Sequence, residues 1–184
     1  MTPLPTLIVV SGPPGAGKTT LAHELARAVG CPAVCRDEIK EGMVHAAPGF
    51  VPGPADELSL RTLPAFFGVL ELLLRAGVTT VAEAAFQDRL WRPGLEPLRD
   101  LARIRVVHCA VDADLALERT LRRRRDNPLR RAHADPGPAE AAALAPAHRA
   151  FDRVAAGDPW IEVDTTHGYD PGLQEILAFV NSRA

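Results

Sequence analysis

The sequence predicts an α/β fold built on a parallel β-sheet. Five short apolar runs alternate with segments of helical periodicity, which is typical of strands joined by right-handed helical crossovers. A Gly-rich loop separates the first of these runs from the first amphipathic segment. The 184 residues contain no linker or internal repeat, so we expect one domain spanning residues 1–184.

The first strand is expected at Leu7–Ser11, followed by the Gly-rich loop and a helix over Thr19–Val29. Gly30 would end that helix as a C′ glycine. A second buried strand is expected at Pro32–Cys35, and the Pro/Gly-rich stretch His45–Asp56 must be a loop.

Asp56 is expected to cap a helix that runs to Arg75, with a disturbance at Pro64. The next strand is expected at Val78–Phe86. Its continuous apolar character predicts a sheet that is covered on both faces.

The rest of the chain supplies two more strands, expected at Arg105–Val111 and Trp160–Thr166. Asp114 is the expected cap of the helix after the fourth strand, Ala139–Ala156 is Ala-rich and helical, and Leu173–Val180 closes the fold. Ligands in such sheets bind beyond the carboxyl ends of the strands, so functional residues are expected there.

Composition narrows the class of protein. A formal net charge of −2 and 5% aromatic residues argue against a general nucleic-acid binder. No apolar run approaches the roughly 20 residues of a membrane span, and the N-terminus lacks the basic start of a signal peptide. The odd count of three cysteines predicts reduced thiols and a cytoplasmic location. Cys31 and Cys35 could ligate a metal, but the sequence places no His/Cys cluster beside them.

The loop "GPPGAGKT" matches the phosphate-binding pattern G-x-x-x-x-G-K-[ST] in full. We expect Lys18 to reach the β- and γ-phosphates of ATP, the Thr19 hydroxyl to ligate Mg²⁺, and Thr20 to lie near the α-phosphate. The expected nucleotide-binding residues of this loop are Gly12, Pro13, Pro14, Gly15, Ala16, Gly17, Lys18, Thr19 and Thr20. An N-K-x-D guanine signature is missing from the sequence, which argues against a GTPase.

A kinase that acts on an alcohol needs a carboxylate to orient the hydroxyl and take its proton. Asp37, the first carboxylate beyond the second strand, is the candidate base. Lys40, three positions on and one of only two lysines, is the candidate to hold the phosphoryl group or an anionic acceptor. Alternatively, Asp37 merely caps a helix and pairs with Lys40. Glu38 and Glu41 are expected to face other directions.

Glu83, at the end of the third strand, is the expected second Mg²⁺ ligand. It could instead hold Mg²⁺ through water, orient Lys40, or pair structurally with Arg89 or Arg92.

The Arg-rich segment 119–138 is expected to form a lid that closes over the triphosphate. Arg119 and Arg123 share a helix face at i and i+4, the first as a nucleotide-binding residue and the second as a catalytic one. Further candidates to swing in or to fasten the lid are Arg130, Arg131, His133 and Asp135. The alternative is a solvated basic surface.

The motifs "GPPGAGKTT", "RDEIK" and "VAEAAF", followed by the Arg-rich segment, resemble those of the small P-loop kinases. The most similar are the phage-type polynucleotide 5′-hydroxyl kinase domain and chloramphenicol phosphotransferase-like proteins, often described only as AAA-type ATP-binding proteins. The resemblance implies a P-loop NTPase three-layer sandwich with strand order 2-3-1-4-5 and adenine near Thr165–His167. It also implies that Asp37 is the general base, while Lys40 stands where the polynucleotide kinases have Arg.

The predicted function is therefore the transfer of the γ-phosphoryl group of ATP to a hydroxyl of a small molecule such as an antibiotic, sugar or nucleoside. The acceptor pocket is expected around the loop 45–56 and the helix that begins near Asp56, with Phe50, Phe66, Phe67 and Trp91 as aromatic candidates. Most of these aromatic residues are expected in the core, and Phe50, on the loop, is the best pocket candidate. Two alternatives stay open: a polynucleotide 5′-hydroxyl kinase, and an ATP-binding regulator that catalyses no transfer.

Overall fold

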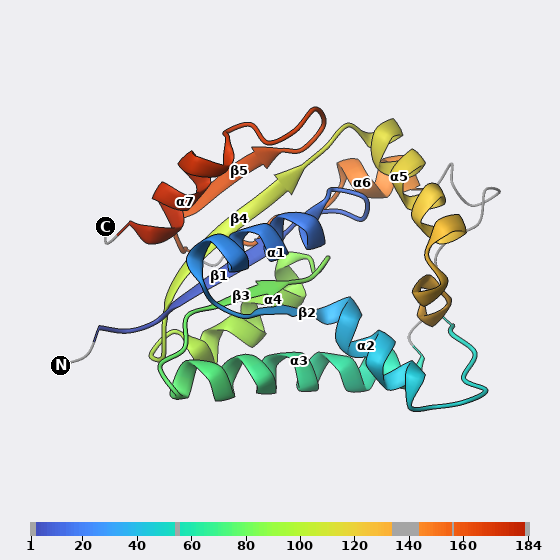
Figure 1. Cartoon of the computed structure of the whole chain (residues 1–184), viewed down its shortest axis with the longest axis horizontal. Helices are drawn as coiled ribbons and strands as arrows, with labels where there is room; N and C mark the ends of the chain where they lie inside the picture. The colour runs from blue at the N-terminus through green and yellow to red at the C-terminus, as the bar shows by residue number, and fades with distance from the viewer. Residues whose placement is uncertain (1–2, 54–55, 134–143, 156, 183–184) are drawn as a thin grey trace.

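In the computed structural model, five parallel strands form one sheet in the order β2-β3-β1-β4-β5 (Figure 1). The structure describes residues 3–53, 56–133, 144–155 and 157–182. The strands are β1 (Thr6–Ser11), β2 (Ala33–Cys35), β3 (Thr80–Glu83), β4 (Arg103–Ala110) and β5 (Trp160–Asp164). The fold class and the strand order are both as predicted.

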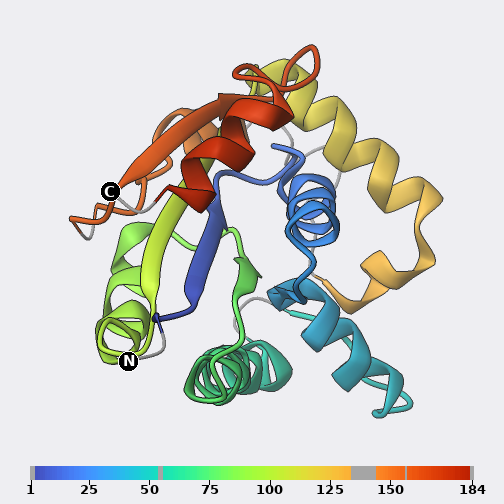
Figure 2. The same cartoon turned by 60° about the vertical axis from the view of Figure 1, so that its left-hand side comes forward.

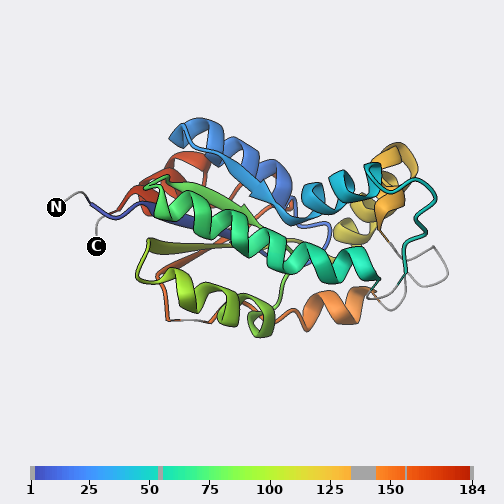
Figure 3. The same ribbon diagram turned by 90° about the horizontal axis from the view of Figure 1, so that it is seen from below.

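Helices cover both faces of the sheet. They are α1 (Lys18–Val29), α2 (Arg36–His45), α3 (Glu57–Arg75), α4 (Asp88–Leu95), α5 (Ala113–Asp126), α6 (Leu144–Arg149) and α7 (Leu173–Asn181), with 3₁₀ turns η1 (Glu96–Leu98) and η2 (Pro128–Ala132). One apolar core lies between the sheet and α1 with α7, and the other lies between the sheet and α3 with α4. In Figure 3, α1 and α4 accordingly lie on opposite sides of the strands.

The central strand β1 shows why the sheet is closed on both faces. All of its residues are buried: Leu7 and Val9 pack toward one core, and Ile8 and Val10 toward the other. Each such side chain contributes about 1.5–3 kcal/mol on burial. An uninterrupted apolar strand of this kind is stable only between two layers of helices.

Several local predictions need correction. The cap of α5 is Asp112, whose Oδ1 accepts from the backbone N–H groups of Asp114 and Leu115 at 3.0 Å each. Pro64 lies inside a continuous α3, because the buried face of that helix outweighs the roughly 3 kcal/mol cost of an internal proline. Helix α4 was not predicted from the sequence at all. In the segment 139–156, the described helix covers Leu144–Arg149, and residues 139–143 lie outside the described ones.

The carboxyl ends of the strands gather the loops that matter for function. The Gly-rich loop after β1, the start of α2 after β2, and α5 after β4 all lie on this side of the molecule (Figure 1). No helix among the described residues is long and apolar enough to cross a bilayer, and all three cysteines are free thiols.

Candidate active site

Glycine is required in the phosphate-binding loop by both conformation and space. Gly12, Gly15 and Gly17 have φ angles of 144°, 80° and 68°. A Cβ on Gly12 would lie 2.3 Å from the Cys109 carbonyl oxygen, and one on Gly15 would lie 2.3 Å from that of Ala116. The loop therefore packs directly on the end of β4 and on α5, and a side chain at either position would push it away.

Gly17, Lys18 and Ala16 make the other contacts that shape this loop. Gly17 is the N-cap of α1, so the positive end of that helix opens into the loop. Lys18 Nζ donates to the Pro13 carbonyl oxygen at 3.0 Å. The Ala16 carbonyl oxygen accepts from Thr165 Oγ1 at 3.2 Å, which ties the loop to the end of β5.

Lys18, Thr19 and Glu83 come together at the end of β3. The Thr19 hydroxyl donates to Glu83 Oε2 at 3.1 Å, and Lys18 Nζ lies 4.0 Å from Glu83 Oε1. Burial raises the pKa of the Glu83 carboxyl, opposed by the adjacent Lys18 ammonium. Arg92 bonds to Asp88 instead, and among the described residues Arg89 makes no ion pair with Glu83.

The two oxygens fit a Mg²⁺ site. Ligands at 2.0–2.1 Å in an octahedron stand about 3 Å apart, close to the separation of Thr19 Oγ1 and Glu83 Oε2. Both are hard oxygen donors of the kind Mg²⁺ prefers. The donor set and its spacing are therefore compatible with the predicted metal.

A cavity of about 580 Å³ adjoins the loop on the side of α5 and the loop after β5. Thr20, Arg119 and Arg123 line it together with Gly15 and Gly17. Arg119 Nη2 donates to the carbonyl oxygens of Thr165 and Thr166 at 2.9 and 3.2 Å. Arg119 thus spans from the cavity to the segment where adenine is expected. Arg123 lies near enough to Glu83 to lower the pKa of that carboxyl.

Asp37 is in the first turn of α2 and bonds to a side chain of the Arg-rich segment. Arg130 Nη1 donates to Asp37 Oδ2 at 2.9 Å, and Arg36 Nη1 donates to Oδ1 at 3.1 Å. The Asp37 side chain is 40% exposed. Partial burial alone would raise the pKa of the Asp37 carboxyl, but His133 and Arg130, followed by Arg36, lower it well below its ordinary value. Asp37 is thus an ionised carboxylate at the sheet edge, paired with arginines and not with Lys40.

His133 extends this contact. Its Nε2 lies 3.1 Å from Glu41 Oε1, and its Nδ1 lies 4.0 Å from Asp37 Oδ1. The expected lid is therefore fastened to α2 at His133. Asp135 and residues 134–138 of the lid lie outside the described residues.

A family model described as an AAA domain matches residues 7–154, most of the chain. The chain belongs to this family of small P-loop kinases. Membership of this P-loop kinase family implies that the chain binds ATP.

Individual relatives agree with the family. The shikimate kinase of Corynebacterium efficiens is 38% identical over 79 residues, which cover 43% of this chain and 46% of that protein. The match thus spans about half of the relative's length. A candidate kinase from Chloroflexus aurantiacus J-10-fl has a similar structure, with a TM-score of 0.84, 22% identity and 97% of each chain covered. An unliganded sugar kinase from Janibacter sp. HTCC2649 has a TM-score of 0.65 at 20% identity, with 97% and 95% of the chains covered. These two solved structures share the fold of the kinase.

Lys40 does not pair with Asp37, which was the alternative that the sequence left open for these two residues. It is buried, and its Nζ donates to Asp56 Oδ2 at 2.7 Å. Asp56 Oδ1 also accepts from the Ser59 backbone N–H at 2.7 Å, which confirms Asp56 as the cap of α3. In this structure, Lys40 joins α2 to the start of α3 across the Pro/Gly-rich loop.

Most of the aromatic candidates for the acceptor pocket lie in the core, as expected. Phe66 and Trp91 are fully buried, Phe67 packs against them, and all three contact Phe86 edge-on or stacked. Phe50 alone of the expected set lies on a loop, 5.8 Å from Lys40 Nζ.

A second cavity, of about 220 Å³, was not foreseen from the sequence. It lies beside Pro14 and is lined mostly by apolar groups of α5 and by Phe151. Gln87 and His148 add polar groups to the wall. His148 Nε2 is buried with no hydrogen-bond partner among the described residues, and burial lowers the pKa of its imidazole.

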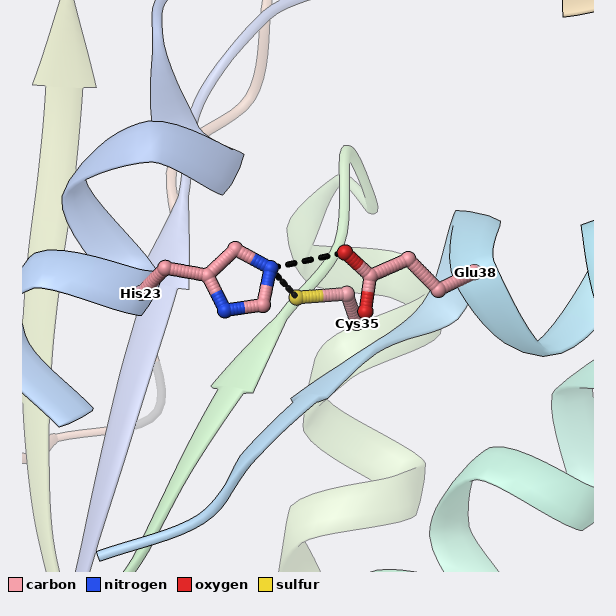
Figure 4. A group of neighbouring side chains, drawn as sticks. All are labelled: His23, Cys35 and Glu38. Atoms are coloured by element: carbon pink, nitrogen blue, oxygen red, sulfur yellow. Dashed lines mark hydrogen bonds and ion pairs between the residues drawn. The ribbon is translucent and has the colours of Figure 1, made fainter. Parts of the chain in front are cut away.

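Cys35 has two neighbours that were not predicted from the sequence. His23 of α1 and Glu38 of α2 both reach it (Figure 4). The expectation that Cys35 has no histidine nearby is therefore wrong. Cys35 is the N-cap of α2 and Glu38 lies three positions on, so these two are neighbours in the sequence. His23 comes from a separate element, and the packing of α1 brings it to them.

Proposed function

We propose that the chain is an ATP-dependent phosphotransferase that moves the γ-phosphoryl group to a hydroxyl of a small molecule. The observation that carries the proposal is the position of Asp37. This ionised carboxylate follows β2 at the carboxyl end of the sheet, as the phosphate-binding loop follows β1, and it contacts the Arg-rich segment.

In the proposed reaction, Asp37 accepts a hydrogen bond from the acceptor hydroxyl, which replaces Arg130 or Arg36 as its partner. The acceptor oxygen then attacks the γ-phosphorus in line, the bond from the γ-phosphorus to the β–γ bridging oxygen breaks, and the hydroxyl proton passes to Asp37. A low pKa suits this role, because positioning matters more than strong basicity in a loose phosphoryl-transfer transition state.

The other residues stabilise charge. Lys18 would leave the Pro13 carbonyl and bind the β- and γ-phosphates, Arg119 would hold the nucleotide near Thr165, and Arg123 would neutralise the charge of the moving phosphoryl group. Thr19 and Glu83 would hold Mg²⁺, which neutralises charge on the phosphate oxygens when bound. Lys40 would bind an anionic acceptor only by exchanging Asp56 for that ligand.

Three observations favour a small acceptor. The partly matching relative is named as a kinase of a small molecule, shikimate. The cavity beside Pro14 has a volume of about 220 Å³, the size of a small ligand. A polynucleotide would need exposed aromatic platforms for its bases, whereas Phe66 and Trp91 are fully buried.

The test is a competition between acceptors. The protein is incubated with γ-labelled ATP and an equimolar panel of sugars, nucleosides, shikimate, aromatic alcohols and an oligonucleotide with free 5′-hydroxyl ends. We expect label on one class of small alcohols. Label on the 5′ ends would identify a polynucleotide kinase instead. ATP binding with no transfer to any member of a broad panel would favour the regulator.

A further inference from the structure

Three potential metal-ligating side chains, His23, Cys35 and Glu38, meet where α1 packs against the end of β2 and the start of α2, next to the proposed active site. His23 Nε2 lies 2.7 Å from Glu38 Oε1 and 3.8 Å from Cys35 Sγ. The three potential ligand atoms all lie within 4.8 Å of one another. Figure 4 shows the imidazole, thiol and carboxylate pointing at a common point between α1 and the start of α2.

The spacing is close to that of a tetrahedral zinc site. With Zn–N and Zn–O bonds of about 2.0–2.1 Å and a Zn–S bond of about 2.3 Å, neighbouring ligand atoms stand roughly 3.3–3.6 Å apart. To reach this geometry, the distance between His23 Nε2 and Glu38 Oε1 would grow by somewhat more than half an ångström. The distance between Cys35 Sγ and His23 Nε2 would shrink by a few tenths of an ångström. Rotation of the half-exposed His23 and Glu38 side chains allows such shifts without moving the backbone.

The donor set selects the kind of ion. One thiolate, one imidazole and one carboxylate suit borderline-soft cations, whereas Mg²⁺ prefers oxygen alone. We propose that His23, Cys35 and Glu38 bind a borderline-soft divalent cation, Zn²⁺ above all, with solvent as the fourth ligand. The site shares no ligand with the Thr19–Glu83 pair, although Cys35 is the register partner of Glu83 in the sheet. It goes beyond the proposed function, since it holds whether or not the protein transfers phosphate.

A bound cation would change both the protonation of Cys35 and the link between α1 and α2. Burial and the neighbouring carboxylates Glu83 and Glu38 raise the pKa of the Cys35 thiol, and a bound dication offsets this because it stabilises the thiolate. The ion would tie α1, which begins at the phosphate-binding loop, to α2, which carries Asp37. Binding should therefore stiffen the junction of the two helices and raise the thermal stability of the protein.

Cobalt is the direct probe, because tetrahedral Co²⁺ reports both its geometry and its thiolate ligand in the absorption spectrum. The full chain, reduced and freed of any affinity tag, is titrated with CoCl₂ in Mg²⁺-free buffer. We expect one equivalent of tetrahedral cobalt with a thiolate-to-cobalt charge-transfer band, and displacement of both signals by one equivalent of ZnCl₂.

Variants locate the ion. Cys35→Ser should abolish the charge-transfer band, and His23→Ala and Glu38→Gln should weaken cobalt binding by more than the roughly 10- to 100-fold typical of an outer-shell partner. Cys31→Ser, four positions away, should leave the spectrum unchanged. Circular dichroism of each variant checks that it is folded, and the exposed positions of His23 and Glu38 make their variants informative even where Cys35→Ser fails to fold.

The proposal is overturned if the wild-type protein binds no stoichiometric cobalt, if bound cobalt shows no thiolate band, or if Cys31→Ser removes it. A zinc-induced rise in Tm that persists in His23→Ala and Glu38→Gln would also contradict it. ATP affinity is measured on the same variants. Loss of the metal site should leave ATP affinity unchanged, because the phosphate-binding loop is intact, so failure of this proposal is distinguishable from failure of the proposed kinase activity.

Discussion

At the scale of single residues, the state of Asp37 is set by its cationic neighbours. Arg130 and Arg36 both donate to its carboxylate, and a carboxylate beside such charges stays ionised at acidic pH. The hydrogen bonds also occupy the oxygens that an acceptor hydroxyl would need. In the proposed reaction, the acceptor hydroxyl replaces Arg130 or Arg36 as a partner of this carboxylate.

Replacement of Arg130 by Ala should move the acid limb of kcat/KM to higher pH. Removal of a nearby positive charge raises the pKa of Asp37, so the active carboxylate is protonated sooner as pH falls. The measurement is kcat/KM against pH for the wild type, Arg130→Ala and Arg130→Lys. The Lys variant retains the charge and should lie closer to the wild type; the exposed Arg125→Ala serves as a control. If the acid limb of kcat/KM did not move in Arg130→Ala, the Asp37–Arg130 pair would not determine the pKa that this limb reports.

Glu83→Gln tests the metal ligands. The amide keeps the size of the side chain but loses the charge that would bind Mg²⁺, so the Mg²⁺ concentration for half-maximal activity should rise about tenfold or more. Activity is measured across a MgCl₂ titration at fixed ATP. The exposed Glu96→Gln is the matched control, and an unchanged Mg²⁺ requirement in Glu83→Gln would remove this carboxylate from the site.

At the scale of elements, the junction of α2 and α3 depends on the Lys40–Asp56 pair. The Lys40 ammonium is buried and bonds to Asp56, and Asp56 in turn caps α3 and accepts from the Gly53 backbone N–H. One carboxylate thus closes the loop and begins the helix. A buried charge of this kind is costly when its partner is removed.

Asp56→Ala should lower the free energy of unfolding by about 3–5 kcal/mol, because it leaves Lys40 unpaired and the helix uncapped. Asp56→Asn keeps a cap acceptor and should cost less. The Lys40→Met, Asp56→Ala double variant should recover part of the loss. Urea unfolding at pH 7 measures all three. A loss under 1 kcal/mol in Asp56→Ala would mean that the pair contributes little.

The Asp56 carboxyl should also make the free energy of unfolding depend on pH. Burial alone would raise its pKa, but the hydrogen bond from Lys40 and those from Ser59 and Gly53 lower it to about 2. The stabilising effect is therefore complete above the unfolded value of about 3.9 and is lost as pH falls toward 2. The wild-type and Asp56→Asn stabilities should converge over this range.

Local patterns account for the elements that the sequence predicted. The strands follow from apolar runs, and Gly30 ends α1 in the left-handed conformation, as its identity indicates. Each of the pairs Asp37–Arg130, Lys40–Asp56 and His23–Cys35 joins separate elements of the fold. Such pairs depend on how two helices pack and leave no periodicity in the sequence. Helix α4 was missed because Pro93 and Gly94 interrupt its short pattern.

At the scale of the whole molecule, one segment spans the length of the site. Arg119 on α5 bonds to the loop after β5, and Arg130 on η2 bonds to α2 (Figure 2). In this view α5 and η2 run from the β5 side of the sheet to α2. Under the proposed function, the segment would therefore join the nucleotide end of the site to the acceptor end. A lid with contacts at both ends would sense both substrates.

The measurement that tests the central claim most directly is label transfer from γ-labelled ATP by wild-type and Asp37→Asn protein, with ATP affinity measured in parallel. If Asp37 orients and deprotonates the acceptor, the variant binds ATP as the wild type does and loses about 10²- to 10⁴-fold in the rate of transfer. A variant that transfers phosphate at the wild-type rate would contradict the account.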